Sequence, residues 1–227
     1  MDLQLAGKTA LVLGGHGYIG RAIVDRLLEE GVVAVPASRN PPGGLVIDGT
    51  DDASVAAGLE AFAADHGRLD ILVVTAAPSA RTLDPARNSD PDQVLEAFTA
   101  KAMSFLRVAN AVLPGMLAAG DGRIIGVSGQ NAFLTGNITG SVRNAALVIA
   151  AKNLADAAAG SGVTVNSVSP GLVSDSPSSE VATAKSGETT PQQIADLVAF
   201  LASPLAASIS GESISVGHRV RGVNGMN

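Results

Sequence analysis

Short apolar runs alternate with longer amphipathic stretches along most of this chain. The apolar runs occupy residues 9–13, 32–37, 45–47, 70–75, 123–128, 163–168 and 213–216. Helix-like stretches separate them at 21–31, 53–67, 92–118, 141–159 and from 191 onward. Continuous apolar runs are typical of parallel strands that are buried on both faces. The pattern predicts an α/β fold of Rossmann type, a doubly wound parallel sheet of about seven strands with helices on both faces, in three layers.

Residues 1–227 are expected to form one such domain, because no linker or repeat interrupts the alternation. Asp51 and Asp52 precede a helical stretch and can cap it. The long helix over 92–118 is expected to be interrupted near Pro114 and Gly115. Residues 129–140 are predicted as a loop. Residues 174–190 are polar and rich in Ser and Thr, which predicts a mobile lid.

The first apolar run ends in a glycine-rich turn that opens the first helix, with the sequence LGGHGYIG. Glycine permits positive φ, and without a side chain it lets a diphosphate approach the amino end of a helix, where free N–H groups and the helix dipole favour negative charge. This context predicts a dinucleotide site, with a purely structural strand–turn–helix as the alternative. The residues assigned to the site are Gly14, Gly15, His16, Gly17, Tyr18, Ile19 and Gly20.

Composition narrows the function classes. Hydrophobic residues make up 46% of the chain and aromatic residues 3%, and the formal net charge is −6 with no basic cluster, so nucleic-acid binding is not expected. The chain has no Cys, which excludes disulfides and thiolate chemistry and is compatible with a reducing cytoplasm. Neither a signal peptide nor a membrane span is expected. His66 and His218 lie far apart in sequence, so no metal site is expected.

The chain resembles the short-chain dehydrogenase/reductases, in their single-domain branch. The resemblance covers nearly the whole length and is carried by LGGHGYIG, DILVVTAA, PGM, RIIGVS, VNSVSPGLV and IADLVAFLASPLAASISGESISV. It implies an oxidoreductase that binds NAD or NADP and moves a hydride to or from the carbonyl or alcohol group of a small molecule. A cytoplasmic location is expected separately, because the chain has no Cys and neither a signal peptide nor a membrane span is expected. It also implies a homotetramer or homodimer formed through the helices at 92–118 and 141–159.

Two cofactor motifs depart from the family pattern. The family's TGxxxGxG would place Thr at 13 and Gly at 18, where this chain has Leu13 and Tyr18, and the middle glycine has moved to Gly17. Similar spacing occurs in the sugar-modifying branch, but this chain is too short for that branch's added substrate region. The family's NNAG motif is replaced by a run that retains backbone contacts but lacks the asparagine side chains; its last three residues are Thr75, Ala76 and Ala77.

The active-site motif departs further. Aligned on the family's YxxxK helix, the chain has Gly140 in place of the catalytic Tyr and Asn144 in place of the Lys. The helical Asn of the family's proton relay falls at Lys101, whereas Ser128 lies at or next to the family's catalytic Ser. The hypothesis is that Lys101, buried with a lowered pKa, replaces the missing acid, that Ser128 orients the substrate oxygen, and that Asn144 bonds a ribose hydroxyl. The alternative is a structural Lys101 whose amine reaches solvent.

Cofactor choice depends on the end of the second strand. NAD-binding folds usually carry a carboxylate there, but this chain has Ser38 and Arg39, which suit a 2′-phosphate, so NADP(H) is favoured and NAD(H) is possible. The resemblance assigns Asp48 to the adenine amine, with a turn cap as the alternative. It also assigns Pro170, Gly171 and Val173 to the nicotinamide pocket, and Asp175 is expected to cap the lid.

Three functions remain open from the sequence. The leading one is an oxidoreductase with an atypical proton relay. The second is a catalytically inactive dinucleotide-binding protein, either a cofactor sensor or a partner subunit, which the missing Tyr and Lys favour. The third is an isomerase or lyase of the epimerase type, suggested by GGHGYIG alone and opposed by the absence of YxxxK.

Overall fold

The computed structural model describes residues 1–77 and 82–223. Seven parallel strands form one sheet in the order β3-β2-β1-β4-β5-β6-β9. Their bounds are β1 Thr9–Leu13, β2 Val33–Ser38, β3 Leu45–Val46, β4 Ile71–Val74, β5 Gly122–Val127, β6 Val163–Pro170 and β9 Ser213–Val216. The predicted doubly wound sheet is confirmed, and β1 lies at the point where the strand order reverses.

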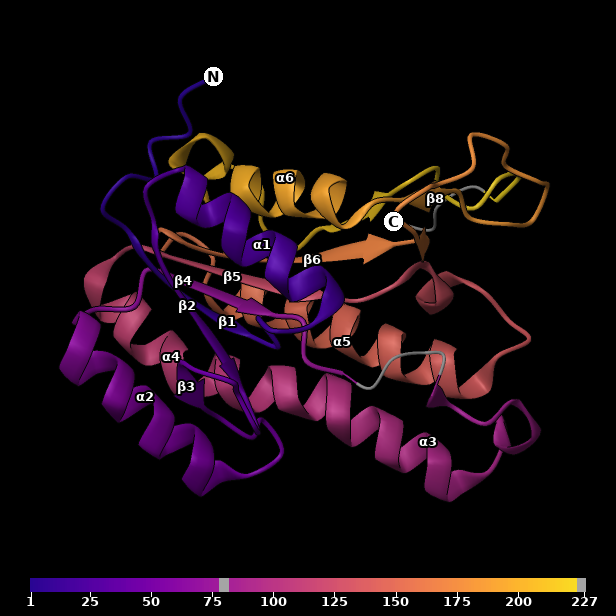
Figure 1. Cartoon of the computed structure of the whole chain (residues 1–227), viewed down its shortest axis with the longest axis horizontal. Helices are drawn as coiled ribbons and strands as arrows, with labels where there is room; N and C mark the ends of the chain where they lie inside the picture. The colour runs from indigo at the N-terminus through magenta and orange to yellow at the C-terminus, as the bar shows by residue number, and fades with distance from the viewer. Residues whose placement is uncertain (78–81, 224–227) are drawn as a thin grey trace.

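Helices cover both faces of the sheet (Figure 1). On one face α1 (Tyr18–Glu29) packs against α6 (Pro191–Ala202), and Ile23, Leu27 and Val198 are fully buried there. The other face is covered by α2 (Asp52–His66), α4 (Ser104–Ala119) and α5 (Ile138–Ala157), with Phe62 and Phe105 in its core. This arrangement explains why β4, β5 and β6 are buried at every position: each central strand has a helix layer on both sides.

The helix before β5 differs from the prediction. It runs from α3 (Pro91–Phe98) through a π-helical turn, η3 (Thr99–Met103), into α4, so the interruption lies near residue 101 and not at Pro114. Pro114 removes one helical hydrogen bond. Its neighbours Val112, Leu113 and Met116 are nevertheless buried in the core of the fold. Tertiary packing therefore keeps the helix continuous at Pro114.

This helical run is also the chain's one segment, within the described residues, that is long and apolar enough to cross a membrane by length and composition, over Pro91–Ala119. Phe105, Val108 and Ala109 of the run are fully buried beneath the sheet. Its apolar character is therefore accounted for by packing in the core of the fold.

Two expectations for loops and caps have different outcomes. Asp51 caps α2 as predicted, since its carboxylate accepts the N–H groups of Ala53 and Ser54. The predicted loop at 129–140 instead contains a 3-10 turn, η4 (Gln130–Phe133), and the first residues of α5. Asn137 caps α5 by accepting the N–H of Gly140, a local bond that the sequence reasoning missed.

The segment predicted as a lid, residues 174–190, begins and ends at a small second sheet. Two short strands, β7 (Leu172–Val173) and β8 (Glu188–Thr189), pair in parallel outside the main sheet. Two further 3-10 turns occur at η2 (Pro85–Arg87) and η5 (Pro204–Ala206). Figure 1 shows this segment beyond the carboxyl end of β6.

Candidate cofactor and active site

The glycine turn between β1 and α1 is packed so closely that it needs its glycines. Gly14 has φ of +85°, and a Cβ there would lie 2.5 Å from Thr75 Oγ1. A Cβ at Gly15 would lie 2.7 Å from the Pro36 Cβ, and one at Gly20 only 2.1 Å from the Gly14 carbonyl oxygen. The turn is closed by a 2.9 Å hydrogen bond from Gly17 N–H to that same oxygen. Backbone atoms therefore approach one another where side chains are absent.

This turn has the features that a diphosphate needs. Gly17 is the N-cap of α1, and no side chain caps this helix end. His16 Nδ1 is buried and has no hydrogen-bond partner within the described residues. A buried ring nitrogen without a partner, beside an uncapped helix end, is suited to a ligand that brings its own oxygens. The residues present therefore fit the diphosphate of a dinucleotide.

Tyr18 and Ile19 differ in their surroundings. Ile19 packs against the core between α1 and α6, whereas Tyr18 is 53% exposed and its hydroxyl donates a 2.6 Å hydrogen bond to Asp175 Oδ1. Asp175 was expected to cap the lid. Its carboxylate joins the start of the 174–190 segment to the glycine turn, so these two segments touch directly.

At the second strand, Ser38 pairs with Val46 and Arg39 is exposed just beyond it. Asp48 accepts hydrogen bonds from the N–H and hydroxyl of Thr50, at 2.9 and 2.7 Å. Burial acts to raise the pKa of Asp48, but these bonds together with the positive charges of Arg39 and Arg107 lower it below its ordinary value. The geometry supports the turn-cap interpretation of Asp48.

The remaining cofactor positions lie at the carboxyl ends of β4 and β6. Thr75 bonds back to the Leu13 carbonyl through both its N–H and its hydroxyl, and Ala76 and Ala77 follow it. Pro170 ends β6, and Val173 of β7 pairs with Thr189 of β8. Gly171 lies so close to the backbone at Gly187 that a Cβ on it would be 2.0 Å from the Gly187 carbonyl oxygen. These ends meet the glycine turn along one edge of the sheet, where open α/β folds bind ligands.

The three proposed relay residues converge in the structure. Lys101 Nζ donates a 3.0 Å hydrogen bond to the Ser128 carbonyl oxygen, and Ser128 Oγ donates a 3.0 Å bond to the Asn144 carbonyl oxygen. The exposed fractions of Lys101, Ser128 and Asn144 are 7%, 5% and 4%. Asn144 Oδ1 is buried without a hydrogen-bond partner within the described residues. The three residues of the hypothesis therefore lie together, although the Ser128 hydroxyl is bonded to Asn144, and the Lys101 side chain is buried and does not extend into solvent.

Lys101 lies in the π-helical turn η3, a distortion often found at functional sites. Burial, and to a lesser degree the positive charge of Arg143, lowers the pKa of Lys101 to about 7. Arg143 is itself buried on α5, and burial lowers its pKa as well. Sequence reasoning missed Arg143, although a cation among small residues of a closely packed helix was a signal that could have found it.

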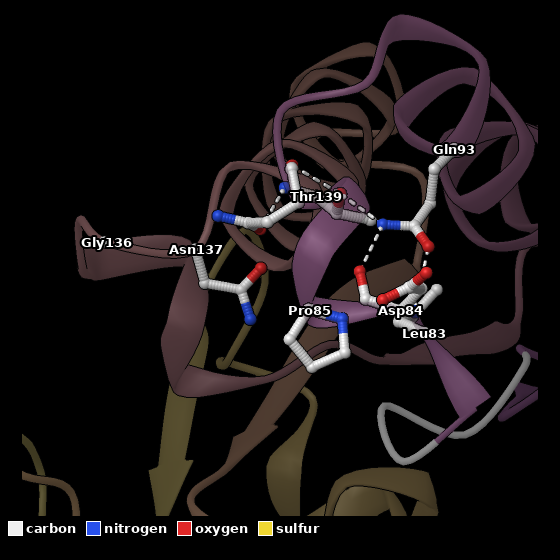
Figure 2. A pocket seen from close by; sticks show the side chains of 8 residues that line it. Leu83, Asp84, Pro85, Gln93, Gly136, Asn137 and Thr139 are labelled. Carbon is white, nitrogen blue, oxygen red and sulfur yellow. Dashed lines mark hydrogen bonds between the residues drawn. The ribbon is translucent and has the colours of Figure 1, made fainter.

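A small cavity of about 180 Å³ lies beside the amino end of α5 (Figure 2). The polar side chains that line it make hydrogen bonds to neighbouring backbone groups. Gln93 Oε1 accepts the Asp84 N–H, and Gln93 Nε2 donates to the Arg87 carbonyl. The Thr139 hydroxyl donates to the Asn88 carbonyl. These bonds fasten the loop at 83–90 to α5. The lining contains none of the three relay residues.

No group of three or more His, Cys, Asp or Glu side chains that could hold a metal occurs in the part of the chain that the structure describes. His66 lies against the ring of Phe62, and His218 follows β9.

Together, the switch point of a parallel sheet and the close-packed glycine turn beside it are typical of a dinucleotide-binding protein of Rossmann type. The family model described as enoyl-(acyl carrier protein) reductase matches residues 18–218. The chain belongs to the short-chain dehydrogenase/reductase family, whose members are NAD(P)-dependent oxidoreductases.

Individual relatives agree over nearly the whole chain. The 3-oxoacyl-[acyl-carrier-protein] reductase FabG of Vibrio cholerae is 30% identical over 239 residues, covering 94% of this chain and 97% of that protein. The D-threitol dehydrogenase of Mycolicibacterium smegmatis is 29% identical, covering 95% of this chain and 93% of that one. A crystal structure of a short-chain dehydrogenase/reductase from Burkholderia xenovorans superposes with a TM-score of 0.80 at 25% identity, covering 94% and 96% of the two chains.

Proposed function

We propose that this protein uses NADP(H) to interconvert a small carbonyl compound and the corresponding alcohol, with a proton relay in which Lys101 replaces the family's tyrosine. The observation that carries the proposal is the placement of Lys101, a buried amine 3.0 Å from the carbonyl oxygen of Ser128, at the position where the family has an asparagine. A bound nicotinamide supplies or accepts the hydride.

The chain's own residues then handle the proton and the geometry. In reduction, the substrate's carbonyl carbon gains the hydride with its electron pair, and the ammonium of Lys101 gives a proton to the oxygen. The amine that remains takes a proton from water. The backbone carbonyl of Ser128 accepts the hydrogen bond that positions the Lys101 amine. The Ser128 hydroxyl donates to the Asn144 carbonyl and thereby holds Ser128 against α5. A general acid of this kind contributes on the order of 10² to 10⁴ in rate.

Asn144 has a separate part in the proposal. Its buried Oδ1 lacks a partner within the described residues, so it can accept a hydrogen bond from a ribose hydroxyl. The amide has no charge and cannot depress the pKa of an acid, which is why the proton chemistry is assigned to Lys101.

The preference for NADP(H) is supported by the exposed Arg39, which directly follows β2 and carries the charge that a 2′-phosphate would pair with. Six residues, 39–44, separate β2 from β3, so no helix covers that side of the turn. Ser38 adds a hydroxyl donor at the same strand end. Asp48 stabilises the turn that follows β3 through its hydrogen bonds with Thr50.

A homo-oligomer is proposed through the helices that follow β4 and β5. Several large apolar side chains are exposed on these helices: Leu95, Leu117, Val142 and Ile149. Exposed apolar residues on adjacent helices are typical of surfaces that become buried in subunit contacts. Location in the cytoplasm stays a prediction from the sequence.

The experiment is a fluorescence titration with NADPH and NADH, followed by a screen of small aldehydes and ketones for oxidation of whichever cofactor binds. The proposal expects tighter binding of NADPH and turnover of at least one compound. Tight binding without turnover on a broad panel would leave the second candidate, a non-catalytic dinucleotide-binding protein. The glycine at position 140 is the observation that favours that candidate. Absence of binding would contradict both.

A further inference from the structure

The turn η4 lies directly on the part of α5 that carries the family's two catalytic positions. A Cβ on Gly129 would lie 3.2 Å from Asn144 Nδ2, and a Cβ on Gly140 would lie 2.9 Å from Asn131 Nδ2. Gly140 and Asn144 are four residues apart in α5, so they share one face of the helix. Asn131 of η4 therefore packs against the face of α5 that carries Gly140 and Asn144, and Ser128 bonds to the Asn144 carbonyl.

The space beside position 140 is filled by two amide groups. Besides Asn131 Nδ2, the Asn137 side chain comes within 3.0 Å of the Cβ position of Gly140. A tyrosine at 140 would have to displace both amides. The Asn131 amide thus occupies space that a tyrosine side chain at position 140 would need.

The side-chain amides of Asn137 and Asn131 differ in their hydrogen bonds. Asn137 Oδ1 accepts the Gly140 N–H at 2.8 Å and caps α5. The Asn131 side chain is half-buried, and within residues 1–77 and 82–223 it makes no hydrogen bond. A partly buried amide next to the relay, without a structural bond of its own, is suited to a ligand.

We propose that Asn131 takes the place of the family's tyrosine as a substrate-binding donor, with its Nδ2 hydrogen-bonding the oxygen of the carbonyl group that is reduced. This inference rests on the proposed oxidoreductase function. The tyrosine's two tasks are then divided: Asn131 binds and polarises the oxygen, and Lys101 gives the proton. An amide donates a hydrogen bond but does not release its proton near neutral pH, so Asn131 leaves the protonation of the product to Lys101.

The expected effect follows from the charge that develops on the oxygen. A preorganised donor aimed at such a charge typically contributes 10² to 10³ in kcat. Asn131→Ala should therefore lower kcat by about that factor while the NADPH Kd changes by less than about threefold. The pH at which activity is half-maximal should stay where it is in the parent protein, because the titrating group is elsewhere. Asn131→Asp, which has the same shape but accepts instead of donating, should lose at least as much.

Asn137→Ala is the matched control, since Asn137 also borders Gly140 but serves as a helix cap. It should lower the melting temperature and leave kcat per folded molecule within about threefold of the parent. Gly140→Ala tests the same contact from the other side, because its Cβ must push Asn131 away. The double variant Asn131→Ala/Gly140→Ala should be no worse than Asn131→Ala alone.

The inference is overturned if Asn131→Ala keeps kcat within about threefold of the parent, or if Asn137→Ala reproduces its loss. Melting curves and NADPH binding of each variant separate misfolding from a catalytic defect; a misfolded Asn131→Ala leaves the decision to Asn131→Asp. The outcome is distinct from failure of the proposed function. If the parent protein shows no turnover, the proposed function fails; if the parent is active and Asn131→Ala is equally active, the assignment of Asn131 alone fails.

Discussion

At the scale of single residues, the burial of Lys101 has consequences for both stability and chemistry. An ammonium group loses hydration when it is buried, and the folded chain therefore favours the neutral amine. With a folded-state pKa of about 7 against an ordinary value of 10.5, the unfolded chain binds more protons than the folded chain between these two pH values. Protonation at this position therefore opposes folding.

The first prediction concerns stability against pH. The penalty for charging Lys101 is absent well above the unfolded pKa of 10.5, grows as pH falls, and is complete below about 7. Lys101→Met removes the titrating group. The melting temperature of this variant should thus improve relative to the parent as pH is lowered from 10 to 7.

The measurement is a series of thermal melts of parent and variant across this range. Lys152→Met is the matched control, because Lys152 is exposed and paired with Asp156. A difference between parent and Lys101→Met that does not vary with pH would show that the lysine does not titrate in the folded state near 7.

The second prediction concerns the pH dependence of catalysis. Carbonyl reduction needs the ammonium form of Lys101, so kcat/KM should fall about tenfold per pH unit above about 7. Alcohol oxidation needs the amine, so its kcat/KM should rise with pH up to the same value and then level off. Opposite limbs that meet near 7 are expected. Profiles that are flat from pH 6 to 9 would exclude Lys101 as the proton donor.

At the scale of secondary-structure elements, the turn between β1 and α1 sets the place for the cofactor. Gly20→Ala would bring a Cβ within 2.1 Å of the Gly14 carbonyl oxygen, and its nearest neighbours are all backbone atoms that cannot rotate away. We expect a loss of roughly 1 to 3 kcal/mol in the free energy of unfolding. NADPH affinity should fall at least tenfold, on the order of 1.4 kcal/mol, because the turn must shift.

Gly115→Ala serves as the control for this third prediction. Gly115 lies in α4, and a Cβ there meets nothing within 4 Å. The same chemical change should therefore be neutral or stabilise by up to about 1 kcal/mol, since alanine favours helix. Denaturant unfolding and NADPH titration of both variants provide the readout; equal effects of the two substitutions would contradict the assigned role of the turn.

The sequence was most informative about elements with a strong repeating pattern. The predicted final strand at 213–216 matches β9, Ser213–Val216, and Pro191 begins the last helix as expected. The turn at Thr99–Met103 had no comparable signal, because a π-helical insertion keeps the same residue types as an ordinary helix. Pro114 misled because a local preference was outweighed by burial in the core.

The proximity of Lys101, Ser128 and Asn144 could be predicted for the same reason, whereas their catalytic roles stay a proposal. Motif alignment located Ser128, Asn144 and Lys101, since each lies within a recognisable element. Asn131 carries no motif, because its contact with Gly140 depends on how η4 folds onto α5. That contact depends on Gly129 and Gly140, whose missing side chains let η4 and α5 approach each other.

At the scale of the whole molecule, the exposed apolar residues on α5 set the fourth prediction. Ile149 is 62% exposed on this helix. Ile149→Glu should place a charge in the proposed subunit contact and reduce the molar mass measured by light scattering after size exclusion. Leu28→Glu on α1, 51% exposed on the opposite side of the sheet, should leave that mass unchanged. A parent protein that is already a monomer would contradict the proposed assembly.

The relay is the claim on which the function of the whole molecule depends, and one comparison tests it most directly. NADPH binding and the rate of NADPH oxidation are measured at pH 7 in the parent protein and in Lys101→Met, with the same carbonyl substrate. Retained NADPH affinity is expected, with turnover reduced on the order of 10² to 10⁴. Full turnover by Lys101→Met would contradict the proposal that Lys101 is the proton donor.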